Sequence, residues 1–325
     1  MSRGLHLAVL SDIHYASPAE QARGDDYEYR ELRPPWLRAF VRAYRRHVWL
    51  RDPLRHNHLL DRFLARVGEV DHVVANGDYT CDSAFVGVMD EPSFQSAAEC
   101  LGRLRARFDG RFHATLGDHD LGKFSFVGTR GGMRLASFQR ARTELGLAPF
   151  WQFDLGRYAV LGVTSSLVGL PVLQKETLPE EREQWNRLRE AHLAEIRAAF
   201  GNLDPARRVV LFCHDPTALP FLASEAEVAS RLDRVDLTII GHLHSRLVYW
   251  ESRLLAGMPA IRGLGHTVRR LSTALNQARA WRPFHVRLCP SLAGVELLKD
   301  GGYLTVRLDP DAAARPEVQF HRLPR

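Results

Sequence analysis

Five short apolar runs in this chain each end on an aspartate or a histidine, and this pattern restricts the possible folds more than any other feature. Such runs are typical of strands covered on both faces. In an open α/β sheet, ligands bind where the carboxyl ends of parallel strands meet. The polar sets that follow the runs are Asp12 with His14, Asp78, Asp118 with His119 and Asp120, His214, and His242 with His244.

These strand ends predict a shared binding site. The central set follows the apolar run from Phe112 to Leu116 and places three ionisable side chains in a row. Burying them is costly without a metal, a substrate or a dense hydrogen-bond network. In an extended backbone, Asp12 and His14 would point to the same side, where they could share one ion. We therefore expect the five polar sets to meet in one cavity.

The remaining pattern predicts alternating strands and helices in one domain over residues 1–325, with insertions at about 15–70 and 253–285. No linker rich in proline, glycine or serine divides the chain. Strands are expected near residues 5–12, 70–75, 112–116, 150–153, 158–163, 208–212, 235–240, 286–288 and 303–308, and helices near 34–50, 58–67, 93–108, 180–200 and 264–278.

Positive charge is concentrated in the two insertions. Residues 30–55 contain eight arginines and two acidic residues, and residues 253–287 contain seven arginines and no acidic residue. These local charges of +6 and +7 exceed the total of +6, so the rest of the chain is acidic. One-signed surfaces of this kind favour an acidic partner.

The first insertion contains a helix with an apolar face. Trp36, Phe40 and Tyr44 recur at helical spacing, and arginines occupy the other faces. One interpretation is an interfacial helix that contacts a membrane surface. The other is an ordinary helix whose apolar face packs on the core and whose basic face is solvated.

The cysteines and the hydropathy indicate the compartment. The four cysteines are scattered and show neither zinc-site nor disulfide spacing, so we expect them to be reduced. No run of eighteen apolar residues predicts a membrane span. An apolar strand pattern starts at Leu5 and leaves no room for a signal peptide. We expect a cytoplasmic protein, with peripheral contact to the inner membrane if the first helix is interfacial.

The ligand types point to transition metals. Mixed imidazole and carboxylate ligation suits manganese, iron or zinc better than magnesium or calcium. Two ions about 3.5 to 4 Å apart can clamp the oxygens of a phosphoryl group during displacement. We expect two divalent ions, with manganese first and iron or zinc as alternatives. The seven candidate ligands exceed what one tetrahedral zinc needs; they are Asp12, His14, Asp78, Asp118, His214, His242 and His244.

The ordered motifs resemble those of the calcineurin-like metallophosphoesterases. That family carries D-x-H, G-D, G-N-H-(D/E), H and G-H-x-H in this order, each after a strand. The resemblance spans residues 12 to 244 and does not cover the insertions or the C-terminal third. The matching segments here are Asp12-Ile13-His14, Gly77-Asp78, Gly117-Asp118-His119-Asp120, His214 and Gly241-His242-Leu243-His244.

The resemblance implies a fold and a set of roles. The fold would be a four-layer α/β/β/α sandwich of two mixed sheets, here with two basic helical insertions. His119 would act on the phosphate as a catalytic residue, and Asp120 would orient it. Asp78 would bridge the two metals. One metal would be held by Asp12, His14 and His244, and the other by Asp118, His214 and His242.

Residue 118 departs from the family pattern, which has asparagine there. An ionised aspartate still offers oxygen ligands, but it adds a negative charge and cannot donate a hydrogen bond to a phosphate. We therefore expect Asp118 to hold metal more tightly and to weaken the attraction for a substrate anion.

The motifs indicate a metal-dependent phosphoester hydrolase and leave its substrate open. Some family members are UDP-2,3-diacylglucosamine pyrophosphatases of lipid A biosynthesis, and the basic amphipathic insertions here are similar in kind. A lipid-linked nucleotide at an anionic membrane surface is therefore our first hypothesis. A cyclic-nucleotide or nucleic-acid phosphodiesterase is the alternative, although few aromatic residues are available for base stacking. A non-catalytic scaffold that has lost its metals is opposed by the intact ligand set.

Overall fold

The computed structural model describes residues 4–24, 34–81, 85–122, 132–261 and 266–325, whose strands form two mixed sheets. In the first sheet, with order β10-β9-β1-β2-β3, the β1–β2 and β2–β3 pairs are parallel. In the second, with order β4-β5-β6-β7-β8, only the β4–β5 pair is antiparallel. The strands are β1 (Leu5–Leu10), β2 (His72–Asn76), β3 (Phe112–Thr115), β4 (Phe150–Leu155), β5 (Tyr158–Val163), β6 (Arg208–Cys213), β7 (Val235–Ile240), β8 (Val286–Leu288), β9 (Gly302–Leu308) and β10 (Glu317–Arg322).

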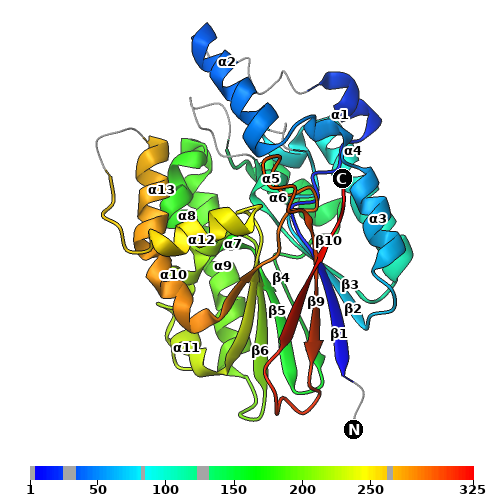
Figure 1. The fold of residues 1–325 in the computed structure, drawn as a ribbon. Coiled ribbons are helices and arrows are strands. Elements are labelled where there is room, and N and C mark those ends of the chain that lie inside the picture. The colour runs from blue at the N-terminus through cyan, green and yellow to red at the C-terminus, as the bar shows by residue number, and fades with distance from the viewer. Residues whose placement is uncertain (1–3, 25–33, 82–84, 123–131, 262–265) are drawn as a thin grey trace.

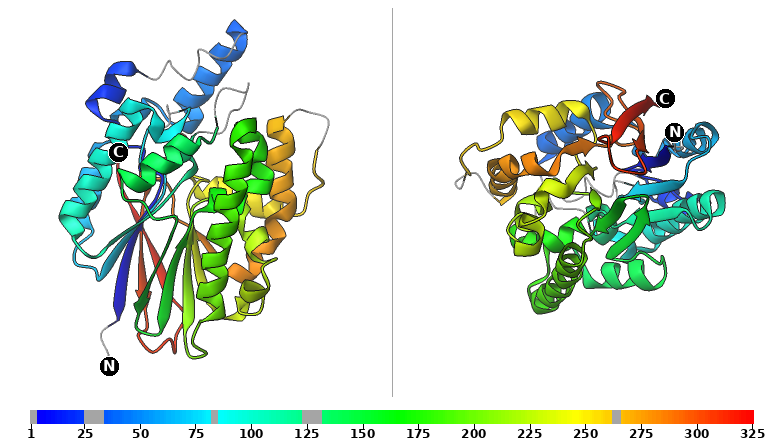
Figure 2. Two further views of the ribbon diagram at one scale, coloured as in Figure 1. Left: turned by 180° about the vertical axis from the view of Figure 1, so that it is seen from behind. Right: turned by 90° about the horizontal axis from the view of Figure 1, so that it is seen from below.

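The two sheets pack face to face, and helices cover their outer faces (Figures 1 and 2). Side chains alternate along a strand, so Leu7 and Val9 of β1 face the second sheet, whereas Ala8 and Leu10 face helices. Val210 and Phe212 of β6 fill the same space between the sheets. Burial on both faces explains the apolar runs, and the expected four-layer α/β/β/α sandwich is confirmed.

Helices α3 and α4 cover the first sheet, and α9 and α10 contribute to the cover of the second. The long helices lie where the sequence predicts them. The helices are α1 (Pro18–Arg23), α2 (Pro35–Tyr44), α3 (His58–Arg66), α4 (Glu91–Phe108), α5 (Asp118–Leu121), α6 (Leu135–Thr143), α7 (Ser165–Val168), α8 (Leu170–Leu173), α9 (Arg182–Gly201), α10 (Leu219–Leu222), α11 (Ala226–Ala229), α12 (Arg246–Leu254) and α13 (His266–Gln277).

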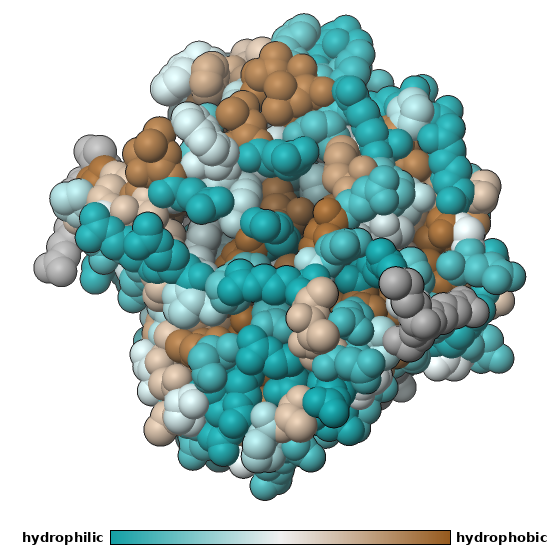
Figure 3. Space-filling model, turned by 60° about the horizontal axis from the view of Figure 1, so that its bottom comes forward, coloured by the Kyte–Doolittle hydropathy of each residue, from teal (hydrophilic) through white to brown (hydrophobic). Residues whose placement is uncertain are grey.

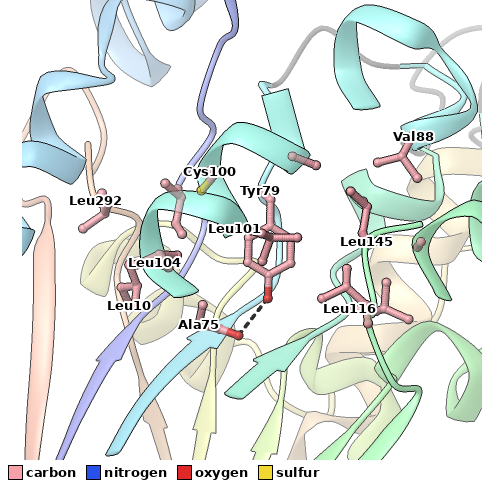
Figure 4. Close-up of a cluster of buried hydrophobic side chains, with 14 of the residues drawn as sticks. Leu10, Ala75, Tyr79, Val88, Cys100, Leu101, Leu104, Leu116, Leu145 and Leu292 are labelled. Atoms are coloured by element: carbon pink, nitrogen blue, oxygen red, sulfur yellow. Dashed lines mark hydrogen bonds between the residues drawn. The ribbon is translucent and has the colours of Figure 1, made fainter. Parts of the chain in front are cut away.

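A buried tyrosine anchors the core below the strand ends. Tyr79 is fully buried among leucines of α4 and of the first sheet (Figure 4). Its hydroxyl lies 2.9 Å from the carbonyl oxygen of Ala75 and 2.8 Å from that of Thr115, both of which accept hydrogen bonds. Because these carbonyls belong to β2 and β3, the phenol ties the ends of two neighbouring strands together.

Helix α2 does not pack on the core. None of its residues is buried, and the side chains of Trp36 and Phe40 are 72% and 63% exposed. A π-helical turn, Arg45–Trp49, continues it, so the helix expected over 34–50 is present. The interpretation of α2 as an ordinary core-packed helix is wrong, because its apolar face meets solvent. Arg30, Arg33, Arg262 and Leu264 of the basic segments lie outside the described residues.

Within the residues that the structure describes, no helix is long and apolar enough to cross a membrane. All four cysteines are free, as their spacing predicts, and all are buried.

Candidate metal centre

The five polar sets meet at the carboxyl ends of β1, β2, β3, β6 and β7. Parallel pairing of β1 with β2 and β3, and of β6 with β7, brings these ends together within each sheet. A backbone hydrogen bond from Asp12 to Gly77 joins the loops of the first sheet, and one from Gly241 to His214 joins those of the second. The amide of His242 donates to the carboxylate of Asp12 at 3.1 Å, which connects the two sheets.

The backbone of the site is unusual. Asp12, His14, Asp78, His242 and His244 all have φ between +48° and +63°, the left-handed region that residues other than glycine rarely adopt. Strain of this kind persists only where the surroundings impose it, and it is concentrated at functional sites. The expectation that Asp12 and His14 share a side because the backbone is extended is therefore wrong. They meet because both residues turn out of the strand into left-handed conformations.

Two motif glycines allow the loops to approach one another. A Cβ atom at Gly117 would overlap Oδ1 of Asp78, and one at Gly241 would overlap Oγ of Ser11 and lie 2.6 Å from Oδ2 of Asp12. Neither position can accept a side chain without moving a carboxylate of the site.

Seven predicted residues form two adjoining groups. In the first, ligand atoms of Asp12, His14, Asp78 and His244 all lie within 4.8 Å of one another. The Nε2 atoms of His14 and His244 are 3.4 Å apart, and Oδ1 of Asp12 is 3.3 Å from Nε2 of His244. All four residues are buried, so this group could hold one ion.

The second group consists of Asp118, His214 and His242. Oδ1 of Asp118 lies 3.2 Å from Nε2 of His214 and 2.8 Å from Nδ1 of His242. Oδ2 of Asp78, from the first group, is 3.1 Å from Nε2 of His214. Asp78 therefore lies between the two groups, where a bridging ligand would have to be.

Backbone carbonyls orient two of the imidazoles. Nδ1 of His14 donates to the carbonyl oxygen of Thr80 at 3.1 Å, and Nδ1 of His214 donates to that of Asn76 at 2.5 Å. Each bond leaves Nε2 as the nitrogen that faces the centre, an arrangement common among metal-ligating histidines. Sequence reasoning did not identify these backbone partners, because a carbonyl group carries no residue-specific signal.

His119 and Asp120 lie beside these groups. The backbone amide of His119 donates to Oδ1 of Asp78 at 3.0 Å, and its ring meets the ring of His14 edge to face at 5.1 Å. The carboxylate of Asp120 accepts hydrogen bonds from the backbone amides of Gly117, Asp78 and Tyr79. Burial, reinforced by the charge of Asp78, raises the pKa of Asp120 to about 7. The Asp120 side chain thus connects the loop that carries Asp78 to the loop that carries Asp118 and His119.

The donor set fits divalent cations. Oδ2 of Asp78 and Nε2 of His214 are buried and face each other at 3.1 Å, and Oδ2 of Asp78 has no other hydrogen-bond partner among the described residues. Burial alone would lower the pKa of His214, but the carboxylates of Asp78 and Asp12 outweigh it and hold that pKa well above its usual value. The carboxylates thus favour positive charge here, which bound cations would supply.

One aromatic residue at the site was not predicted. The ring of Trp49 packs on the imidazole of His244, with centroids 4.8 Å apart and an interplanar angle of 36°. Trp49 ends the helical segment that contains α2, and its carbonyl accepts a hydrogen bond from the amide of Glu296 at 2.7 Å. No motif marks this tryptophan, since its position depends on segments far apart in the chain.

A family model covers the segments that carry the site. A model of the calcineurin-like phosphoesterase family matches residues 5–246. Among solved structures, phosphopantetheinyl hydrolase from Mycobacterium tuberculosis is 14% identical, over 75% of this chain and 84% of its own, with a TM-score of 0.38. A metallophosphoesterase from Sphaerobacter thermophilus is 14% identical, over 99% and 89%, with a TM-score of 0.34.

Among curated proteins, none matches the chain closely enough to count as a relative. The family model covers well over half of the sequence and includes all five motifs. The chain therefore belongs to the calcineurin-like phosphoesterase family and is a metal-dependent phosphoesterase.

Proposed function

We propose that this phosphoesterase cleaves the pyrophosphate of a lipid-linked nucleotide, such as UDP-2,3-diacylglucosamine, at the surface of an anionic membrane. The observation that carries the proposal is the exposed apolar surface of α2 and its physical connection to the metal centre. A hydrolase of small soluble phosphoesters has no need for an exposed tryptophan and phenylalanine on a helix that is connected to its active site.

The connection runs through the turn that follows α2. Trp49 packs on His244, and the amides of Glu296 and Leu297 donate to the carbonyls of Trp49 and Val48. Leu297 is itself 61% exposed. The loop that carries Leu297 is therefore joined to the segment that follows α2, and that segment contacts His244, a candidate metal ligand.

Helix α12 adds a third apolar element. It begins directly after His244, and its capping residue Ser245 donates to Asp300 at 2.7 Å, which ties it to the same loop. Together these elements form what we call the apolar rim. In Figure 3, the largest brown (hydrophobic) areas lie in the upper half of the view. The rim consists of the exposed residues Trp36, Phe40, Tyr44, Leu247, Trp250, Leu254, Leu297 and Leu298.

Charge supports an anionic surface as the partner. Arg42 and Arg46 are exposed on and just after α2, and the helix has no acidic residue in its first turn. Basic residues near apolar side chains attract the anionic headgroups of a bilayer, by about 1 kcal/mol for each cation close to the surface. Helix α2 would then lie in the headgroup region, with its aromatic side chains inserted.

The reaction would use the residues of the metal centre. We propose that Asp12, His14 and His244 hold one cation, that Asp118, His214 and His242 hold the other, and that Asp78 contacts both. Two bound divalent ions, manganese first, would supply Lewis acidity toward the phosphoryl oxygens. His119 would donate a hydrogen bond to the phosphate or a proton to the leaving oxygen. Asp120 would hold the loop of Asp78 and the loop of His119 in fixed positions relative to each other.

The direct test is hydrolysis of UDP-2,3-diacylglucosamine in mixed micelles with manganese, measured as UMP release. The variant Trp36→Ser/Phe40→Ser is expected to lose at least tenfold in kcat/KM for this substrate and to retain hydrolysis of bis(p-nitrophenyl) phosphate. Met89→Ser, which removes an exposed apolar side chain outside the rim, is the matched control.

Other outcomes of this assay identify the alternatives. Release of UMP at background level, together with turnover of a cyclic nucleotide or an oligonucleotide, would replace the lipid substrate with a nucleotide one. Absence of metal after manganese loading, measured by elemental analysis, would instead support a non-catalytic scaffold.

A further inference from the structure

A second feature of the surface is a hollow of about 540 Å³ at the outer edge of the second sheet. Its walls come from β7 and β8, the C-terminal half of α12, the 3-10 helix Ala278–Phe284 and the chain that enters β10. We call it the basic hollow, because five arginines line it: Arg253, Arg279, Arg282, Arg287 and Arg315.

Acidic groups do not balance the charges of the hollow within the described part of the chain. Asp236 is the only carboxylate among the described lining residues, and its Oδ1 atom pairs with Arg208 at 2.5 Å. Within the described chain, none of the five lining arginines has a carboxylate oxygen within 4.0 Å. Arginines brought together in this way repel one another, and a bound anion would relieve that repulsion.

Nearly buried apolar side chains lie behind the hollow. Leu237, Trp281 and Val286 contribute to its lining, and Trp281 is 7% exposed. Tyr249 lies parallel to Trp281, donates its hydroxyl to the carbonyl of Val286 at 2.9 Å and carries the guanidinium of Arg253 over its ring. These contacts tie α12 to β8 and to the 3-10 helix, the elements that carry four of the five lining arginines.

The basic hollow is separate from the metal centre. Asp236 is near the start of β7, whereas His242 and His244 follow its end at Ile240. At a rise of about 3.3 Å per residue, Asp236 lies roughly 13 Å from Ile240. Helix α12 joins the two places, because it begins next to His244 and contributes Tyr249 and Arg253 to the hollow.

We propose that the basic hollow is a second anion-binding site, which takes an anion that carries two or more phosphate groups. Guanidinium groups bind phosphate oxygens in bidentate fashion, and several of them around one hollow favour a multiply charged ligand over a single phosphate. The same chemistry is found in a soluble diphosphate and in the headgroup of a lipid that carries two phosphates. The site does not depend on which ester the metal centre cleaves.

The test uses the manganese-loaded full chain and methylenediphosphonate, a diphosphate analogue that resists hydrolysis. Isothermal titration is expected to show two classes of site, one at the metals and one in the hollow. The variant Arg282→Glu/Arg287→Glu is expected to lose the second class, by at least tenfold in affinity, and to keep the first. Arg107→Glu/Arg187→Glu, with the same charge change on α4 and α9, is the matched control.

A second arm identifies the source of the anion. Co-sedimentation with vesicles that contain cardiolipin, whose headgroup carries two phosphates, is compared with that of phosphatidylcholine vesicles for the same variants. If Arg282→Glu/Arg287→Glu loses only diphosphonate binding, the hollow is assigned to a soluble ligand. If this variant loses both diphosphonate binding and vesicle binding, the hollow is assigned to lipid headgroups. Equal binding of both probes by the hollow variant and the control variant would overturn the proposal. Hydrolysis of bis(p-nitrophenyl) phosphate reports that each variant is folded.

Discussion

The indole ring of Trp49 lies against the imidazole of His244, with 4.8 Å between their centroids. This contact joins the helical segment of α2 to a candidate metal ligand. A metal-ligating histidine depends on its surroundings for its orientation, and loss of such support commonly lowers metal affinity by 10- to 100-fold.

Trp49→Ala is therefore expected to weaken manganese binding about tenfold and to lower kcat, because His244 loses the surface that holds its ring. Metal titration at equilibrium, followed by turnover at saturating manganese, measures both effects. Trp49→Phe retains a packed ring and should restore most of the affinity. Equal manganese affinity in the alanine variant and the wild type would show that the contact is incidental.

Asp118→Asn restores the residue that the family has at this position. The variant should retain metal less tightly, since one negative charge is removed from the ligand set, and it should bind a substrate anion more tightly. Burial raises the pKa of Asp118, but His242 and His214 outweigh it and hold the pKa well below the usual value, so the wild-type side chain is ionised at neutral pH. Dialysis against a chelator and the KM for bis(p-nitrophenyl) phosphate measure these effects. Unchanged metal content and KM would refute the role assigned to this charge.

Gly117→Ala should abolish activity, because the new methyl group would overlap Oδ1 of Asp78 and push this carboxylate out of place. The expected result is at least a hundredfold loss of turnover and a measurable loss of bound metal. Gly102→Ala in α4 is the matched control. Apart from the backbone of its own helix, no described atom lies within 4 Å of its added methyl group, and alanine stabilises a helix interior by about 0.5–1 kcal/mol relative to glycine.

Acid should destabilise the fold through His113. Burial, followed by the nearby His72, lowers the pKa of His113 to about 4 from 6.5. Above pH 6.5 the ring is neutral in both the folded and the unfolded state, so it does not make the free energy of unfolding depend on pH. As the pH falls from 6.5 toward 4, His113 becomes protonated in the unfolded state but stays neutral in the folded state. Stability is therefore lost across this pH range.

At pH 5 this loss is about 1 kcal/mol, after allowance for solvent screening of a half-buried ring. Urea unfolding of the wild type and of His113→Phe at pH 7.5 and pH 5 measures it. The phenylalanine variant should gain relative to the wild type at the lower pH. An unchanged difference between the two proteins at both pH values would contradict the lowered pKa.

The order of apolar runs and polar ends is sufficient to predict the α/β architecture and the meeting of the five polar sets. Both follow from local chemistry. A strand buried on both faces needs a continuous apolar run, as in β1, and parallel pairing brings carboxyl ends to one edge. Asp12, Asp78 and His214 could therefore be assigned to one site without any coordinates.

Other properties were decided by the tertiary structure alone, because each depends on contacts between distant segments. The left-handed backbone at Asp12 and His14 is imposed by neighbouring loops, so periodicity along an extended strand gave the wrong geometry. Helical periodicity identified the apolar face of α2 but could not say whether the core would cover it, and the fold leaves it exposed. The meeting of Arg315 with arginines 28 to 62 residues earlier in the chain is likewise a product of packing, since no local pattern relates them.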